Sequence, residues 1–235
     1  MGAFVLKYED FSAAAAGAAA AGAVAVPKAG QSGWYARAGK RIFDVTLGLI
    51  VLPLLTPVIV VLWLIARMDG GPGFYGHERI GQFGVTFRCW KIRSMVCDAN
   101  ERLHALLDSD PKARAEWEHD QKLTNDPRVT RFGAFVRRTS LDELPQIFNV
   151  MCGDMSFVGP RPIVDEELAR YGAREQAYLQ SKPGITGIWQ LSGRNEVSYS
   201  ERVEFDAEYA EKVSLGLDVA LVLRTPASVL LATGK

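Results

Sequence analysis

The stretch Thr46–Ala66, TLGLIVLPLLTPVIVVLWLIA, decides what kind of protein this chain forms, because its 21 residues carry no charge. A helix of about 20 apolar residues matches the thickness of a bilayer's hydrocarbon core. Pro53 and Pro57 lie near the middle, where each removes a backbone donor and disfavours helical geometry in the residue before it. The stretch therefore predicts a bent helix in contact with a membrane.

Basic residues flank this stretch on both sides, with Arg37, Lys40 and Arg41 before it and Arg67 after it. Because basic residues collect on the cytoplasmic side of a membrane helix, two cytoplasmic ends would satisfy the pattern. A helix that enters one leaflet and returns needs partners for its freed carbonyls, and the Thr56 hydroxyl is a candidate. Kinked helices that span the bilayer are also tolerated. The residues alone leave both arrangements open.

The composition excludes several classes of protein. The chain has 235 residues, and its 27 basic and 27 acidic residues cancel. Without net charge or a long run of Lys and Arg, we expect no nucleic-acid partner. Cys89, Cys97 and Cys152 form no C-x-x-C pair, and we interpret them as small buried side chains of a protein in a reducing compartment. The histidines lack the spacing of zinc ligands.

The chain divides into three regions. Residues 1–33 include the Ala-rich run Ser12–Ala25, which has too little large apolar surface to build a core and predicts a flexible tail. A signal peptide is disfavoured because the start carries two acids and the run is alanine rather than leucine. We expect residues 34–69 to form a membrane-embedded region and residues 70–235 to form a single domain with it.

Local patterns predict the secondary structure of that domain. Residues 70–95 hold six glycines and alternating aromatic residues, which favour a hairpin of short strands. Asp98–Lys122 favours a helix interrupted at Asp110-Pro111. The motif S-x-x-E at Ser198 favours a capped helix start, and Val213–Thr233 is a second apolar stretch.

The sequence lacks the common nucleotide-binding loops. The chain has no G-x-x-x-x-G-K-[ST] loop and no strand-linked G-x-G-x-x-G, so side chains would have to hold a nucleotide. Asp108-Ser109-Asp110 has the D-x-D form of a metal site. It lies in a charged helical stretch, and we interpret it as a solvated helix end.

The strongest local candidate site is the pair Asp142 and Glu143. The pair follows Arg137-Arg138 and precedes an apolar run with Pro145, so it lies at or just before a helix N-terminus. A capping box from Ser140 to Glu143 is one interpretation, but it would place Pro145 inside the helix. A helix that starts nearer Pro145 leaves both carboxylates available for a catalytic or binding role. Beside the arginines and the helix end we expect Asp142 to be ionised, and an ionised aspartate can attack phosphorus or bind Mg²⁺.

Further charged residues are candidates for phosphate binding. Arg161 lies between two prolines that fix the backbone and orient a guanidinium suited to bidentate phosphate contacts, although a surface arginine in a rigid turn fits equally. Lys91 and Arg194 are further basic candidates. Asp218 stands in the apolar context LGLDVALVL, where burial requires a basic or metal partner.

An ordered series of motifs resembles one protein family. The series comprises FDV at Phe43–Val45, Thr56-Pro57, ERIG at Glu78–Gly81, KIRSM, DPRVTRFG, SLDELPQ, GDMSFVGPRP, KPGITGIWQLSGRN and SLGLD. In these motifs the chain is similar to the bacterial sugar transferases, the monotopic phosphoglycosyl transferases, from about Lys40 to its C-terminus. The stretch Phe74–His77 resembles the galactose-type members that initiate exopolysaccharide assembly.

The resemblance implies a mostly helical α+β fold: a monotopic membrane protein with a re-entrant helix broken at Thr56-Pro57, amphipathic interfacial helices and a small β-hairpin. It also implies transfer of a hexose-1-phosphate, with galactose expected, from a UDP-sugar to undecaprenyl phosphate with release of UMP. The protein is then expected on the cytoplasmic face of the bacterial inner membrane, in contact with its lipid. Self-association as a homodimer is a further expectation.

The resemblance implies a role for each candidate residue. Asp142 is the nucleophile and contacts Mg²⁺, while Glu143 assists the lipid phosphate. The remaining candidates are the phosphate and nucleotide contacts Lys91, Arg137, Arg161 and Arg194, and the polar partner Asp218. Two other classes stay open. One is a non-catalytic, membrane-anchored adaptor of polysaccharide assembly, and the other is an aspartyl-phosphate hydrolase, whose usual D-x-D-x-[TV] pattern is missing.

Overall fold

The computed structural model describes residues 33–120, 123–192 and 197–231. The longer helices are α2 (Lys40–Arg67), α3 (Ala99–Ser109), α4 (Pro111–Asp120), α5 (Arg131–Arg138), α6 (Gln146–Cys152), α10 (Tyr199–Lys212) and α11 (Leu215–Leu231). The shorter helical segments are η1 (Tyr35–Gly39), η2 (Gln82–Gly84), η3 (Leu141–Glu143), α7 (Asp165–Leu168), η4 (Ala169–Arg174), α8 (Glu175–Leu179) and α9 (Ile188–Leu191). The strands are β1 (Phe74–Ile80), β2 (Thr86–Ile92), β3 (Ser156–Val158) and β4 (Gly184–Thr186). The expectation of a mostly helical α+β fold with a small hairpin is confirmed.

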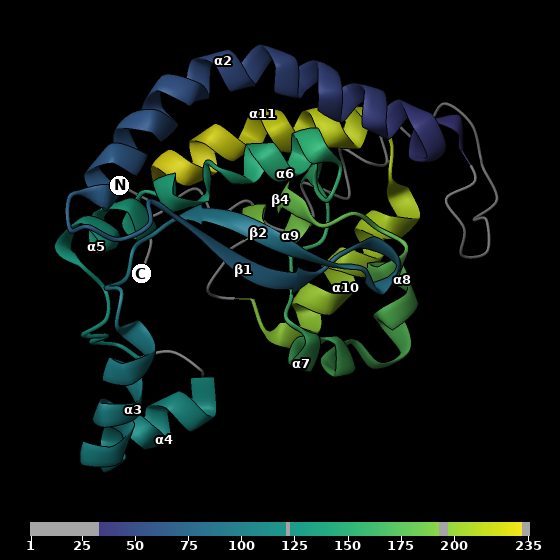
Figure 1. Ribbon diagram of the computed structural model, residues 1–235. Helices are drawn as coiled ribbons and strands as arrows, with labels where there is room; N and C mark the ends of the chain where they lie inside the picture. Colours follow the sequence, from purple (N-terminus) through teal and green to yellow (C-terminus); the bar gives the residue numbers. More distant parts are fainter. Residues whose placement is uncertain (1–32, 121–122, 193–196, 232–235) are drawn as a thin grey trace.

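Helix α2 contains the apolar stretch and continues unbroken through both of its prolines. Figure 1 shows it as one long arched ribbon along the outside of the molecule. Pro57 leaves the Pro53 carbonyl without its usual amide donor. The Thr56 hydroxyl donates to the neighbouring Leu52 carbonyl at 2.7 Å, not to that freed carbonyl. The structure therefore has the bent helix that the prolines predict, without the break at Thr56-Pro57 that the resemblance implies.

The N-terminal end of α2 is fixed to the rest of the molecule. The Arg41 guanidinium donates to the carbonyls of Val150 at 2.6 Å and Met151 at 2.7 Å, at the end of α6. Gly48 allows α6 to approach closely, because a Cβ atom at this position would lie 2.3 Å from the Met151 sulfur. Arg41 thus provides a C-terminal cap for α6 and joins the two helices.

The C-terminal end of α2 is fixed to the same body. Leu62 and Ala66 are buried against Ile92 of β2 and Val136 of α5. The Arg93 guanidinium, from the end of β2, donates to the Ala66 carbonyl. Both ends of the apolar helix therefore pack on one globular unit.

Between its two ends, α2 exposes a large apolar surface. The exposed residues are Leu49, Ile50, Leu54, Val58, Val60, Val61, Leu64 and Ile65. The helical stretch Tyr35–Arg67 is long and apolar enough to cross a membrane, and only 17% of its most apolar window is buried in the protein. Exposed apolar surface of this extent marks a membrane or partner contact rather than a soluble core helix.

The predicted hairpin is formed by β1 and β2, which pair antiparallel with Tyr75 opposite Lys91. Asn149 of α6 fixes the hairpin. Its side-chain oxygen accepts a bond from the Trp90 amide at 3.0 Å, and its amide donates to the Arg88 carbonyl at 2.8 Å. The hairpin is thereby held against the helix that follows the Asp142 segment.

A second sheet was not predicted from the sequence. Strands β3 and β4 pair in parallel, with Ser156 opposite Gly184. Each strand has only three residues, and local patterns carry no signal for a pairing between such distant segments. Val158 of β3 packs with Leu221, which ties α11 to this sheet.

Helices α3 and α4 form a pair that projects from the rest of the molecule, as Figure 1 shows. The predicted interruption at Asp110-Pro111 is confirmed, and the Asp110 carboxylate accepts a bond from the Lys112 amide at 2.8 Å. Asp108 forms an exposed ion pair with Arg114 at 3.0 Å. The D-x-D motif is therefore a solvated helix end, as interpreted from the sequence.

The three cysteines differ in exposure. Cys89 is buried, but Cys97 and Cys152 are exposed, so the prediction of three buried cysteines is wrong for two of them. Cys97 lies in the loop before α3, and Cys152 ends α6. The predicted tail, residues 1–33, lies outside the described residues apart from Gly33.

Candidate active site

The segment between α5 and α6 positions Asp142 and Glu143. Ser140 has a φ of 57°, which is uncommon outside glycine and turns the chain into η3. The Ser140 side chain makes no capping bond, so the capping box is not formed. Helix α6 begins at Gln146, directly after Pro145. Both acids therefore precede the helix, as the position of Pro145 predicts.

The Asp142 carboxyl is buried, with 8% of the residue exposed. Burial raises its pKa to about 6, with nearby Lys91 and Arg137 opposing the rise and Glu143 adding to it. From the sequence, we expect the neighbouring positive charges and the helix end to affect the pKa of Asp142 more than burial does. In the structure desolvation outweighs them, although a group of this pKa is still mostly ionised at pH 7.

Two basic residues from other elements join the acid pair. The Lys91 amine, on β2, forms an ion pair with the Glu143 carboxylate at 2.7 Å. Arg137, in the last turn of α5, donates from Nε to the Ser94 hydroxyl at 2.8 Å. The structure thus brings together four of the expected site residues from β2, α5 and η3.

Arg161 is exposed, with its guanidinium carbon 5.6 Å from the centroid of the Trp189 ring. Its charge reaches Cys89, a buried residue of β2. Burial raises the pKa of the Cys89 thiol, and Lys91 and Arg161 both oppose that rise. Arg161 and Lys91 therefore flank one strand residue. Arg194 lies outside the described residues.

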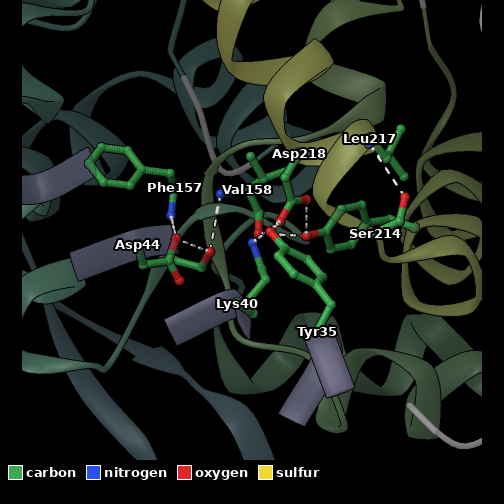
Figure 2. A network of polar contacts seen from close by, with 10 residues as sticks. Tyr35, Lys40, Asp44, Phe157, Val158, Ser214, Leu217 and Asp218 are labelled. Atoms are coloured by element: carbon green, nitrogen blue, oxygen red, sulfur yellow. Dashed lines mark hydrogen bonds and ion pairs between the residues drawn. The ribbon is translucent and has the colours of Figure 1, made fainter. Parts of the chain in front are cut away.

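Asp218 belongs to a different polar cluster, shown in Figure 2. It is fully buried and accepts hydrogen bonds from Tyr35 at 2.5 Å, Lys40 at 2.7 Å and Tyr209 at 2.7 Å. Lys40 is the basic partner that burial requires. No interaction among the described residues joins Asp218 to Asp142, so the structure gives no support to a place in the phosphate site. Asp218 instead ties η1 and the start of α2 to α11.

Asp44 is a buried acid that received no individual role from the sequence. It accepts bonds from the Ser156 hydroxyl at 2.8 Å and the Phe157 amide at 3.1 Å (Figure 2). The FDV motif was the available signal, because an acid at the start of an apolar helix must find partners inside the protein. Asp44 fixes α2 to β3.

Arg79, in the ERIG motif, also received no role from the sequence. It lies 3.6 Å from the Glu167 carboxylate and donates to the His77 ring at 3.2 Å. Burial is the main cause that lowers the pKa of His77, to about 4, with Arg79 adding to the effect. His77 is therefore neutral at pH 7 and can accept this bond.

The profile described as "Bacterial sugar transferase" matches residues 35–232. The chain belongs to this family. Over 195 residues it is 52% identical to the undecaprenyl-phosphate galactose phosphotransferase of Salmonella typhimurium, a match that covers 83% of this chain and 41% of that protein. Over 197 residues it is 46% identical to the exopolysaccharide production protein ExoY of Sinorhizobium fredii, which covers 83% of this chain and 87% of that protein.

A more distant relative differs in the sugar that its name gives. The chain is 37% identical, over 195 residues, to the UDP-glucose:undecaprenyl-phosphate glucose-1-phosphate transferase of Escherichia coli, covering 79% of this chain and 39% of that protein. The chain therefore spans about two fifths of the length of several relatives that it matches and most of the length of others.

The donor set of this bacterial sugar transferase fits Mg²⁺ in the form common at phosphate sites. No group of three His, Cys, Asp or Glu residues in the described part of the chain could hold a metal ion alone. Mg²⁺ at phosphate sites usually takes one or two carboxylates and completes its shell with substrate phosphates and water. With Glu143 paired to Lys91, the Asp142 carboxylate is the ligand that the protein would supply.

Proposed function

We propose that this chain transfers a hexose-1-phosphate from a UDP-sugar to undecaprenyl phosphate and releases UMP, as the first membrane step of exopolysaccharide assembly. The observation that carries the proposal is the buried Asp142 carboxyl, with a pKa of about 6, beside the Lys91–Glu143 ion pair. Galactose is the proposed sugar, because the 52% identical relative is named for galactose and the relative named for glucose is 37% identical.

In the first step, a carboxylate oxygen of Asp142 attacks the phosphorus that carries the sugar. A bond forms between this oxygen and the phosphorus, the bond to the bridging oxygen breaks, and UMP leaves with the electron pair. The raised pKa suits a nucleophile, because the carboxylate is ionised at pH 7 yet more basic than an exposed aspartate.

In the second step, a phosphate oxygen of the lipid attacks the same phosphorus and Asp142 leaves as a carboxylate. Glu143, oriented by Lys91, assists the lipid phosphate. Arg137 and Arg161 neutralise charge that develops on the phosphoryl oxygens, and we assign Arg194 the same role. Mg²⁺ held by Asp142 and the donor phosphates would add to this neutralisation. Two separate steps allow the soluble donor and the lipid acceptor to bind in turn.

We further propose that α2 is re-entrant and that the protein sits on the cytoplasmic face of the bacterial inner membrane. Arg41 and Arg93 tie the two ends of α2 to one body, whereas a spanning helix would place its ends on opposite sides of the bilayer. The apolar residues between these ends face away from the body. This arrangement supports an apolar arch that dips into one leaflet.

Single cysteines test this topology. Trp34 and Met68 flank the arch and are 70% and 83% exposed, so a cysteine at either position is open to a membrane-impermeant thiol reagent once Cys97 and Cys152 are replaced. Both positions should react in inverted vesicles and neither in intact cells. Reaction of either position in intact cells would contradict the re-entrant arrangement. Pro57→Ala should shift the Trp34 position toward the outside, because it favours a straight span.

Release of UMP tests the reaction. The purified protein in detergent with Mg²⁺ is supplied with UDP-galactose or UDP-glucose, with and without undecaprenyl phosphate, beside Asp142→Asn. Multiple turnovers should require the lipid and should be absent in the variant. If no UDP-sugar from a wider panel gives UMP, the chain acts as an adaptor and the proposed reaction is wrong.

A further inference from the structure

A cavity of about 360 Å³ lies between the C-terminal end of α2 and the start of α5. Figure 1 shows these two elements next to each other at one end of the arch. The apolar part of the cavity wall consists of Ile65, Ala66, Met68 and Phe132. Ile65 and Met68 are exposed, and Ile65 belongs to the apolar surface of α2. The cavity therefore opens where the arch meets the body of the protein.

The polar side chains of the wall are already paired within the protein. Every N–H group of the Arg93 guanidinium has an acceptor, which is either the Asp69 carboxylate or one of three backbone carbonyls. The Thr130 hydroxyl accepts a bond from the Gly133 amide at 2.8 Å and donates to the Ser94 carbonyl at 3.4 Å. Because these side chains leave no unpaired charge for a phosphate or a headgroup, the cavity suits a hydrocarbon chain.

One cluster of apolar side chains joins the cavity to the Asp142 site. Ala66 and Phe132 of the cavity wall belong to the same cluster as Leu141 and Leu144. These two leucines flank the acid pair in the sequence. The cavity and the nucleophile are therefore separated by a single layer of side chains.

Helix α5 connects the same two places. Phe132 lies in its first turn and Arg137 in its last turn, about 7.5 Å further along the helix axis. Arg137 donates to the Ser94 hydroxyl, and Ser94 directly follows Arg93 of the cavity wall. A short hydrocarbon chain that starts from a phosphate at the Asp142 site therefore reaches the cavity.

We propose that this cavity binds the first isoprene units of the lipid acceptor, next to its phosphate. The inference rests on the proposed function, because that function places the phosphate of the same lipid at Asp142 and Glu143. The rest of the chain leaves the cavity past Ile65 and Met68, along the exposed apolar surface of α2. Burial of apolar groups drives this binding, so each carbon that enters the cavity adds to the affinity.

An acyl chain of a bilayer phospholipid has the same hydrocarbon chemistry. The position of the cavity favours the acceptor, because the acceptor phosphate has to reach Asp142 while most of its chain stays in the membrane. A phospholipid has no such requirement. An assay without phospholipid therefore separates the two sources.

Ile65→Trp tests the inference, because an indole ring at the opening excludes part of the chain. The full chain in phospholipid-free detergent receives Mg²⁺, the UDP-sugar that the wild type accepts, and either undecaprenyl phosphate or farnesyl phosphate. The KM for each lipid should increase roughly 10- to 100-fold, since both lipids place the same first units in the cavity. Release of one UMP per chain without a lipid should stay unchanged, which also shows that the variant is folded.

Ile50→Trp is the matched control. Ile50 is 62% exposed on the same helix and is not part of the cavity wall. The substitution adds the same ring to the same apolar surface, so its effects on detergent binding and membrane insertion match those of Ile65→Trp. Both KM values should stay within about twofold of the wild type.

Photolabelling gives a second measurement that needs no variant. Farnesyl phosphate with a diazirine on its first isoprene unit should label wild-type peptides that contain residues 65–68 or Phe132. Label found only on other peptides would overturn the inference.

The kinetic experiment can overturn it as well. Unchanged KM values in Ile65→Trp would mean that the acceptor chain does not enter the cavity, and a cavity that holds a bilayer phospholipid gives this result. Equal increases in Ile65→Trp and Ile50→Trp would mean that the effect belongs to the whole apolar surface. Failure of the proposed function looks different, because the wild type would then release no UMP from any UDP-sugar.

Discussion

Replacement of Asp142 by asparagine should make the protein more stable while it removes activity. Folding raises the pKa of this carboxyl from 3.8 to about 6, so the folded chain holds its proton more tightly than the unfolded chain. The contribution of Asp142 to stability is therefore greatest below pH 3.8 and is lost as the pH rises through about 6. This shift amounts to about 3 kcal/mol of destabilisation at pH 7. Asparagine keeps the shape without the charge, so Asp142→Asn should recover up to that amount.

Thermal unfolding in detergent, followed by circular dichroism, measures the effect. A gain of about 3 kcal/mol corresponds to a rise of roughly 6 to 12 °C for a chain of this size. At pH 5 the gain should fall to about half, because the folded wild type is then mostly protonated. Absence of a gain at pH 7, or a gain that is the same at pH 5, would refute the reasoning.

Asp126 supplies a control of opposite sign. The Arg128 guanidinium bonds the Asp126 carboxylate at 2.7 Å and holds its pKa below the usual value against the opposing effect of burial. Its charged form is therefore favoured in the folded state. Asp126→Asn should lower the unfolding temperature at pH 7, where Asp142→Asn raises it.

Three further predictions concern the site and its frame. The rate of UMP release without acceptor should fall as the pH drops through about 6, where Asp142 becomes protonated. Lys91→Met should move this fall to higher pH, because the Lys91 charge lowers the pKa of Asp142. An unchanged pH profile would show that Lys91 does not act on the nucleophile. Arg161→Ala should raise the donor KM roughly 10-fold with little change in the acceptor KM. An unchanged donor KM would show that Arg161 is only a residue of a rigid turn and does not bind the donor. Asp218→Ala should cost about 3 kcal/mol of unfolding free energy, because it leaves the Lys40 amine buried without its partner. A loss below about 1 kcal/mol in denaturant unfolding would contradict this.

Local sequence signals predicted much of the fold. The uncharged run Thr46–Ala66 forms most of α2, and Pro111 marks the change from α3 to α4. Pro145 placed the acid pair before a helix, because proline is disfavoured in a helix interior. Each of these signals acts within a few residues, which is why a single sequence reveals it.

Contacts between distant segments were not predictable in this way. Burial of Asp218 predicts a basic partner, but the sequence does not reveal that this partner is Lys40, which lies about 180 residues away. The pKa of Asp142 depends on burial by other elements, which no local pattern reveals. The same holds for Arg202, which lies over the Trp189 ring only because α10 packs against α9.

The most direct test of the account is the mass of the protein after reaction with the donor alone. With UDP-galactose, Mg²⁺ and no lipid, the wild type should release one UMP per chain and gain the mass of one hexose phosphate. Peptide mapping should place the added mass on Asp142, and undecaprenyl phosphate should then remove it. UMP release that occurs only with lipid and leaves no adduct, or an adduct on another residue, would contradict covalent catalysis by Asp142.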